Sequence, residues 1–217
     1  MNIALGLLVA GVSTSAFAVM EWPLRSIRWT KIPSITVVSA EEDARIGPLR
    51  EAVDFWNRTF AELGTPFHLG DLTRVTGSVP AADIQDLGSQ VVNHTWWPAL
   101  PGSLNQFPGD LLIVLSEAKF VSFTAYRRGR VIIGIKSANQ PPLTLPNVLR
   151  NVIAHELGHA VGLEHNEDPN LLMCGRPASC RPDAFQSGTP RFFPLSAHER
   201  GRLLSLYPKN WTARAHD

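Results

Sequence analysis

The sequence predicts an α+β fold in which strands and helices share one core. Apolar or β-branched runs at residues 110–115 and 130–135 indicate buried strands. Apolar residues at helical spacing over residues 47–63 indicate an amphipathic helix. A more uniformly apolar segment that starts near Pro146 indicates a largely buried helix, because it covers more than one stripe.

Two stretches near the N-terminus are expected to form strands. Residues 22–40 contain β-favouring segments at 27–29 and 35–38, with Pro33 between them as a break or bulge. Residues 66–69 are the candidate for a second strand.

The first helix is expected over residues 47–63. Pro48 lies at its start and Gly64 directly after its last residue, which is the usual punctuation of a helix. Its apolar stripe includes Trp56 and Phe60, and we interpret both as core residues.

Residues 76–109 predict a loop, since they are rich in Gly, Pro, Ser and Asn and show little periodicity. Two tryptophans, Trp96 and Trp97, stand out in this segment. They could line a substrate cleft or contact a partner, or they could cap a loop against the core. His68 and His94 lack the spacing of metal ligands, so neither is assigned to a metal.

The later elements follow clearer signals. Residues 124–126 and 130–135 predict a hairpin-like pair of strands. Near the C-terminus, Ser196 and Glu199 match a capping box that begins a last helix. The residues that follow this helix, 209–217, are expected to fray.

The composition gives little indication of function. The 217 residues are 44% hydrophobic and 18% charged, with a formal net charge of +1. This balance predicts one globular domain after an N-terminal extension. It gives no indication of nucleic acid or an anionic membrane surface as a partner. Function must therefore be argued from a local site.

The N-terminal segment predicts export. Residues 1–18 carry no charged side chain and end in an Ala-x-Ala pattern, which is typical of a secretory signal cleaved before Val19. The segment lacks an early Lys or Arg, so an uncleaved anchor over residues 3–20 is the alternative, although it is short for a membrane span. We expect a secreted or extracytoplasmic monomer, bound to a membrane only if this segment stays uncleaved.

One motif carries most of the functional information. His155, Glu156, His159, Gly162 and His165 form the pattern H-E-x-x-H-x-x-G-x-x-H. On a helix the first two histidines lie one turn apart on the same face. The glycine can end the helix with φ > 0 and let the third histidine approach. Three protein ligands leave a fourth position for water, as in catalytic zinc sites.

This stretch resembles the metzincin metallopeptidases, whose extended zinc motif is followed by a Met-turn. Met173 stands eight residues after His165, and the Asp-Pro that precedes Leu-Met is most similar to the matrixin branch. Residues 195–207 are similar to the matrixin C-terminal helix. The resemblance is strong over residues 146–175 and only architectural before them.

The resemblance implies a metallopeptidase domain over residues 19–208. Such a domain has a twisted mixed β-sheet, an active-site helix and a C-terminal helix, with zinc in the cleft between subdomains. Residues 121–126 are the candidate for an antiparallel edge strand that pairs with substrate. His198 and Glu199 stand where many matrixins carry two aspartates, the second of which pairs with a new N-terminus in that family.

The implied cofactor is one catalytic Zn²⁺ held by His155, His159 and His165. Glu156 would act as the general base towards water, and Met173 would lie under the metal as a hydrophobic floor. A structural Ca²⁺ or a second Zn²⁺ cannot be read from the sequence. The implied partner is a protein or peptide substrate.

The two cysteines, Cys174 and Cys180, follow this motif closely. An even number in an exported protein indicates a disulfide, here one that closes a small loop beside the site. The alternatives are two free thiols, or Cys174 acting as a metal ligand in a latent state.

Two functional alternatives also stay open. One is a catalytically silent binding module stabilised by zinc, and the other is a narrow processing peptidase for one exported protein. The intact Glu156 favours an enzyme, because a binding module has no need of a base beside the ligands.

Overall fold

The computed structural model describes residues 27–93, 95, 98–127, 129–175 and 178–214. The predicted signal segment, His94, Trp96 and Trp97 lie outside these residues. Among the helices that the structure describes, none is long and apolar enough to cross a membrane.

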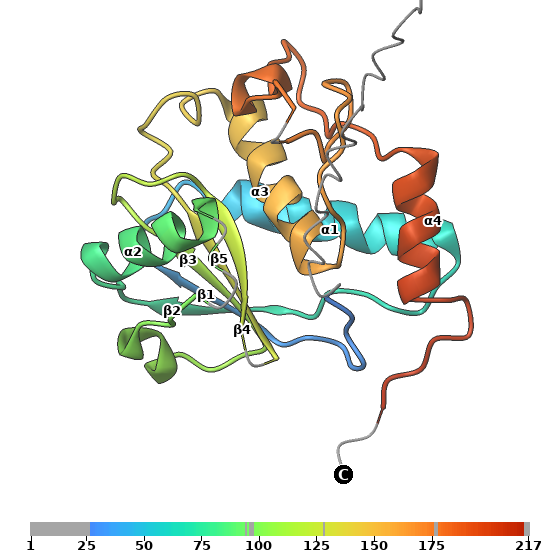
Figure 1. The fold of residues 1–217 in the computed structure, drawn as a ribbon, viewed down its shortest axis with the longest axis horizontal. Coiled ribbons are helices and arrows are strands. Elements are labelled where there is room, and N and C mark those ends of the chain that lie inside the picture. Colours follow the sequence, from blue (N-terminus) through green and yellow to red (C-terminus); the bar gives the residue numbers. More distant parts are fainter. Residues whose placement is uncertain (1–26, 94, 96–97, 128, 176–177, 215–217) are drawn as a thin grey trace, which may run out of the picture.

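A five-stranded mixed sheet forms one side of the molecule (Figure 1). In sequence order the strands are β1 (Ile35–Ser39), β2 (Leu72–Thr76), β3 (Leu111–Leu115), β4 (Phe123–Arg127) and β5 (Arg130–Ile135). Their order in the sheet is β2-β1-β3-β5-β4. All pairs are parallel except β4, which runs antiparallel to β5 at one edge. The predicted α+β class, the central buried strand and the hairpin-like pair are confirmed.

Helices cover both faces of the sheet (Figure 1). In sequence order they are α1 (Ile46–Leu63), α2 (Ala81–Val92), α3 (Pro146–Ala160) and α4 (Ala197–Leu206). Leu111 and Ile113 of β3 pack with α1 and α3, whereas Leu112 and Val114 pack in a second cluster with α2. Because both faces of β3 are buried, the strand is a continuous apolar run instead of an alternating one.

The helices at 47–63 and after Pro146 are confirmed to within one residue. Gly64 caps α1 with φ of 73°, and its N–H donates to the carbonyl oxygens at the helix end. Trp56 and Phe60 are fully buried, as predicted for core residues. The Trp56 indole donates to the Ala154 carbonyl at 2.9 Å, so this aromatic side chain joins α1 directly to α3.

Two predicted strands are absent from the sheet. Residues 27–29 are irregular and run along the end of α3, where the Trp29 indole donates to the Ala160 carbonyl at 2.8 Å. Residues 66–69 are also irregular, because the Asn57 side chain of α1 hydrogen-bonds to both main-chain groups of Leu69. A helix side chain thus satisfies these groups in place of a strand ladder, and the second strand forms at β2.

The prediction of a loop over residues 76–109 is wrong for α2. Its buried side consists of Ile84, Leu87 and Gly88, and the remaining positions are mostly polar. A Cβ on Gly88 would lie 3.0 Å from the Phe123 ring, so this glycine allows α2 to approach β4 closely. Such a small apolar face gives a weak periodic signal, and a glycine within it weakens the signal further.

The C-terminal residues are held more firmly than predicted, as far as Arg214. Trp211 is buried, and its ring meets that of Phe67 edge to face at a centroid distance of 5.1 Å. The Arg214 N–H donates to the Thr30 carbonyl at 2.7 Å. The segment after α4 therefore packs against the N-terminal side of the domain.

Candidate metal centre

The first two predicted ligands come from α3, which is buried along most of its length. His155 and His159 lie four residues apart on this helix, and their ring centroids are 4.8 Å apart. His155 is 9% exposed, His159 is half-buried and His165 is exposed. Exposure to solvent therefore increases from His155 to His159 to His165.

The three imidazoles converge on one point. The Nε2 atoms of His155, His159 and His165 lie 3.0–3.2 Å from one another. Zinc–nitrogen bonds of about 2.0–2.1 Å in a tetrahedron place the nitrogens about 3.3–3.4 Å apart. The donor set therefore fits one zinc ion with little adjustment. Among the residues that the structure describes, it is the one group of three or more His, Cys, Asp or Glu placed to hold a metal.

Main-chain carbonyls orient two of the rings. His155 Nδ1 lies 2.8 Å from the Leu172 carbonyl oxygen, and His159 Nδ1 lies 2.9 Å from that of Leu163. Because a carbonyl only accepts, each Nδ1 carries the proton and each Nε2 presents its lone pair to the centre. These contacts are the outer hydrogen bonds that metal-binding histidines usually make.

The electrostatics also favour neutral rings. Burial, with the neighbouring His165 as a lesser cause, lowers the pKa of His155 to about 4. Burial and the two other histidines also hold the pKa of His159 well below its ordinary value. Neutral imidazoles at neutral pH are the form that binds a metal ion.

A turn at Gly162 brings the third histidine back towards the helix. Gly162 has φ of 96°, and a Cβ at this position would lie 2.4 Å from the Ile27 carbonyl oxygen and 2.7 Å from Leu206 Cδ1. Both the backbone conformation and the space therefore require glycine. The prediction that this residue ends the helix and turns the chain is confirmed.

Met173 packs against α3 at Gly158, the residue before His159. It is fully buried, and a Cβ on Gly158 would lie 2.4 Å from its sulfur atom. Gly158 thus leaves the space that the thioether fills. The main chain around Met173 also supports the site. The Leu172 carbonyl hydrogen-bonds to the His155 ring, and the Met173 carbonyl accepts a hydrogen bond from the Asn166 N–H at 2.9 Å.

A short pairing of two loop segments supports His165. Asn166 forms a parallel bridge with Cys174, and the Gly175 N–H donates to the Asn166 carbonyl. A Cβ on Gly175 would lie 2.3 Å from the His165 ring, so this glycine lies directly against the imidazole.

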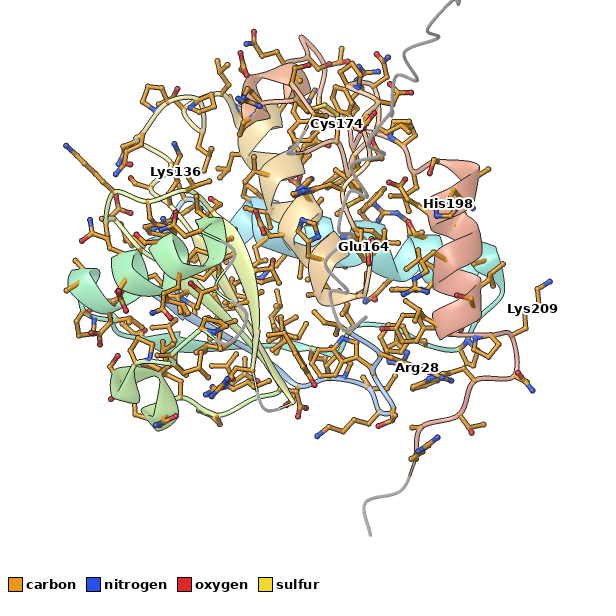
Figure 2. The ribbon with its side chains drawn as sticks, viewed as in Figure 1. Arg28, Lys136, Glu164, Cys174, His198 and Lys209 are labelled. Atoms are coloured by element: carbon orange, nitrogen blue, oxygen red, sulfur yellow. A yellow bond between two sulfur atoms is a disulfide. The ribbon has the colours of Figure 1, made fainter. Side chains whose placement is uncertain are left out.

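The predicted disulfide between Cys174 and Cys180 is present, and their Cα atoms are 5.8 Å apart. Figure 2 labels Cys174, and the loop that carries it lies beside α3.

Glu156 is buried beside the three histidines, with its side chain 6% exposed. Burial raises the pKa of its carboxyl to about 7, and a hydrogen bond from Thr124 opposes that shift. Thr124 Oγ1 lies 2.7 Å from Glu156 Oε2 and 2.9 Å from the Glu156 carbonyl oxygen. A carboxyl group that titrates near neutral pH is suited to exchange protons with water.

The polar side chains that hold the loop after Met173 were not predicted from the sequence. Asn151 is fully buried on α3, and its amide donates to the Arg191 carbonyl while its oxygen accepts from the Phe193 N–H. Asn147, one turn earlier, bonds in the same way to Phe185 and Arg191. The i, i+4 spacing that the two asparagines share with His155 and His159 was the available signal.

The carboxylate of Glu199 ties α4 to the loop at His165. It accepts from the Ser196 N–H at 2.6 Å, which completes the predicted capping box, and from the Asn166 side-chain amide at 2.6 Å. His198 is exposed on the same helix (Figure 2). His68 is also exposed and lies 3.1 Å from the Pro66 carbonyl oxygen, away from the three converging histidines.

No protein-family model matches the chain, and no curated protein matches it. Solved structures similar to this one include archaemetzincin from Methanopyrus kandleri, with 18% identity and a TM-score of 0.48 over 82% of this chain and 96% of that one. Metalloproteinase-II from Bacteroides fragilis matches with 15% identity and a TM-score of 0.46, over 82% of this chain and 54% of that one.

A chaperone–substrate complex also matches, with 17% identity and a TM-score of 0.45 over 79% of this chain and 34% of that one. Because these identities and TM-scores are low, the functional proposal below rests on this chain's own residues.

Proposed function

We propose that this protein is a zinc-dependent endopeptidase of the metzincin type. The observation that carries the proposal is the convergence of the Nε2 atoms of His155, His159 and His165 beside the buried carboxyl of Glu156. The packing of Met173 against Gly158 of the helix that carries two of the histidines supports the metzincin assignment. The Asp-Pro before Leu-Met and the eight-residue spacing to this methionine favour the matrixin branch.

The proposed chemistry divides between the metal and the chain. His155, His159 and His165 would hold a zinc ion, which when bound would lower the pKa of a coordinated water and polarise a peptide carbonyl. Glu156 accepts the proton of the attacking water and later transfers it to the leaving amine. The Leu172 and Leu163 carbonyls keep two of the imidazoles in the tautomer that presents Nε2.

The proposed substrate is an extended peptide that pairs with β4. This strand lies at the edge of the sheet and runs antiparallel to β5, as expected for residues 121–126 from the resemblance. Thr124, on the same strand, contacts Glu156, so a peptide on β4 would lie close to the general base. Main-chain hydrogen bonds would supply affinity and side-chain pockets would supply selectivity.

We also propose that the protein acts outside the cytoplasm. The Cys174–Cys180 disulfide supports this, because structural disulfides persist in oxidising compartments. The absence of a membrane-spanning helix among the described residues is compatible with it.

The test is digestion of a mixed peptide library by the purified protein, read by mass spectrometry. We expect internal cuts that disappear after chelation and return when zinc is added. The Glu156→Gln variant should bind zinc but lose activity by at least about 100-fold, because general base catalysis typically contributes 10²–10⁴-fold. A folded, zinc-loaded protein that makes no cuts would contradict general proteolysis and favour the binding module or a peptidase with a single substrate.

A further inference from the structure

The side chain of Thr124 links the edge strand β4 to α3 by hydrogen bonds. Phe123 and Ala125 point into the core cluster on the side of α2, while Thr124 points the opposite way, towards α3. Tyr126, two residues further along the strand, is 38% exposed. Thr124 is therefore the residue through which the proposed peptide-binding strand reaches the proposed base.

The Thr124 hydroxyl has two acceptors and one proton. It lies 2.7 Å from Glu156 Oε2 and 2.9 Å from the Glu156 carbonyl oxygen, so it donates to one of them at a time. A charged carboxylate is the stronger acceptor and makes the shorter bond. The Thr124 hydroxyl therefore binds the Glu156 carboxyl group through Oε2.

We propose that Thr124 is a positioning residue: its hydroxyl holds Glu156 Oε2 and thereby directs Oε1 towards the attacking water. The proposal rests on the proposed function of Glu156 as the general base. It also means that the strand receiving the substrate fixes the orientation of the base. Displacements of about 1 Å can cost about 100-fold in rate, so one hydrogen bond can control turnover.

A purely structural role for Thr124 would have different consequences. If its hydroxyl served only to satisfy the Glu156 carbonyl and pack β4 on α3, its loss would lower stability and leave turnover unchanged. The two roles can be separated by comparing kcat with KM and by comparing Val with Ser at this position. Valine keeps the shape of threonine without the hydroxyl, whereas serine keeps the hydroxyl.

The experiment uses the full chain in four forms: wild type, Thr124→Val, Thr124→Ser and Thr73→Val. Thr73 is an exposed residue of β2 at the opposite edge of the sheet, so its variant is the matched control. Zinc content is measured for each protein, followed by kcat and KM on a peptide from the library. Crystal structures of the wild type and Thr124→Val then give the position of the Glu156 carboxyl group.

We expect Thr124→Val to bind one zinc per chain, to keep its KM and to lose about 10- to 100-fold in kcat. Its Glu156 carboxyl group should leave the wild-type orientation. Thr124→Ser and Thr73→Val should stay close to wild type. An unchanged kcat together with an unchanged carboxyl position in Thr124→Val would overturn the proposal.

Failure of the proposed function can be recognised separately. If the wild type itself shows no zinc-dependent cleavage, the endopeptidase proposal fails. The crystal structures still decide the positioning role in that case, because a carboxyl group that stays in place without the Thr124 hydroxyl contradicts it.

Discussion

The two halves of the candidate metal centre are held by different kinds of interaction. His155 and His159 are carried by α3, where main-chain helical bonds and a surrounding apolar core fix their positions. His165 is carried by a loop, which is held by short main-chain pairings at Asn166 and by a glycine packed against its ring. The positions of the two helical histidines therefore depend on α3 and its core, whereas the position of His165 depends on contacts between loop segments.

This comparison predicts where substitutions separate stability from zinc affinity. Substitutions of Asn147 or Asn151 should lower the stability of the whole domain, because these buried side chains join α3 to the loop after Met173. Changes around His165 should leave the fold intact and weaken the site.

The largest expected effect is that of Asn151→Leu. Leucine has a similar size, but it leaves the Arg191 carbonyl and the Phe193 N–H without their partner. A buried polar group left unsatisfied costs about 1–3 kcal/mol, so two of them predict a loss of roughly 2–6 kcal/mol. Chemical denaturation measures this change. Asn139→Leu, at an exposed position, is the control, and an equal effect from both variants would contradict the anchoring role.

Gly175→Ala should weaken zinc binding while the fold is kept. The new methyl group would lie 2.3 Å from the His165 ring and must displace it. Altered support of a ligand typically costs about 10- to 100-fold in metal affinity. Competition with a chelator measures that affinity. Gly188→Ala is the matched control, because a Cβ there meets no atom within 4 Å. Wild-type affinity in the Gly175 variant would show that His165 moves freely.

Removal of the disulfide by Cys174→Ser with Cys180→Ser should have a more moderate effect. The two residues are six positions apart, and closure of so short a loop predicts a contribution of roughly 2 kcal/mol to stability. We expect a small drop in zinc affinity as well, because Cys174 lies between Met173 and Gly175. Thermal unfolding of the zinc-free protein isolates the first effect. A variant more stable than wild type would contradict a supporting role for this bond.

The smallest expected effect concerns a carboxylate outside the centre, Asp43. Burial would raise its pKa, but hydrogen bonds from Arg45 and the charge of that residue outweigh burial and hold the pKa below 3.8. Asp43 therefore contributes stability at neutral pH, which is lost as the pH falls through its lowered value. Asp43→Asn should reduce the loss of stability in acid by about 1 kcal/mol. Identical pH profiles for both proteins would refute this.

The same comparison explains what could be predicted from the sequence. The bounds of α1 and α3, the buried strand β3 and the turn at Gly162 follow from local periodicity and punctuation, so they were predicted correctly. The anchoring of Leu69 by Asn57, and of the loop after Met173 by Asn147 and Asn151, could not be predicted in that way. Each depends on a polar side chain that meets a distant main chain, which leaves no periodic pattern.

The positions of the candidate site residues divide in the same manner. The spacing of the motif predicted the three histidines and the adjacent glutamate as site residues, and the resemblance to metzincins added Met173. Thr124 and Glu199 were not identified as parts of the site, because their contacts with Glu156 and Asn166 span 32 and 33 residues. These contacts become apparent only in the folded structure, where β4 and α4 lie next to the candidate metal centre.

We propose that the helical half and the loop half of the centre together bind one zinc ion through the three imidazoles. X-ray absorption spectroscopy of the zinc-loaded protein tests this most directly. We expect one zinc per chain with nitrogen and oxygen ligands at about 2.0–2.1 Å, and loss of one nitrogen ligand in His165→Ala. A sulfur ligand at about 2.3 Å, or an unchanged spectrum in that variant, would contradict it.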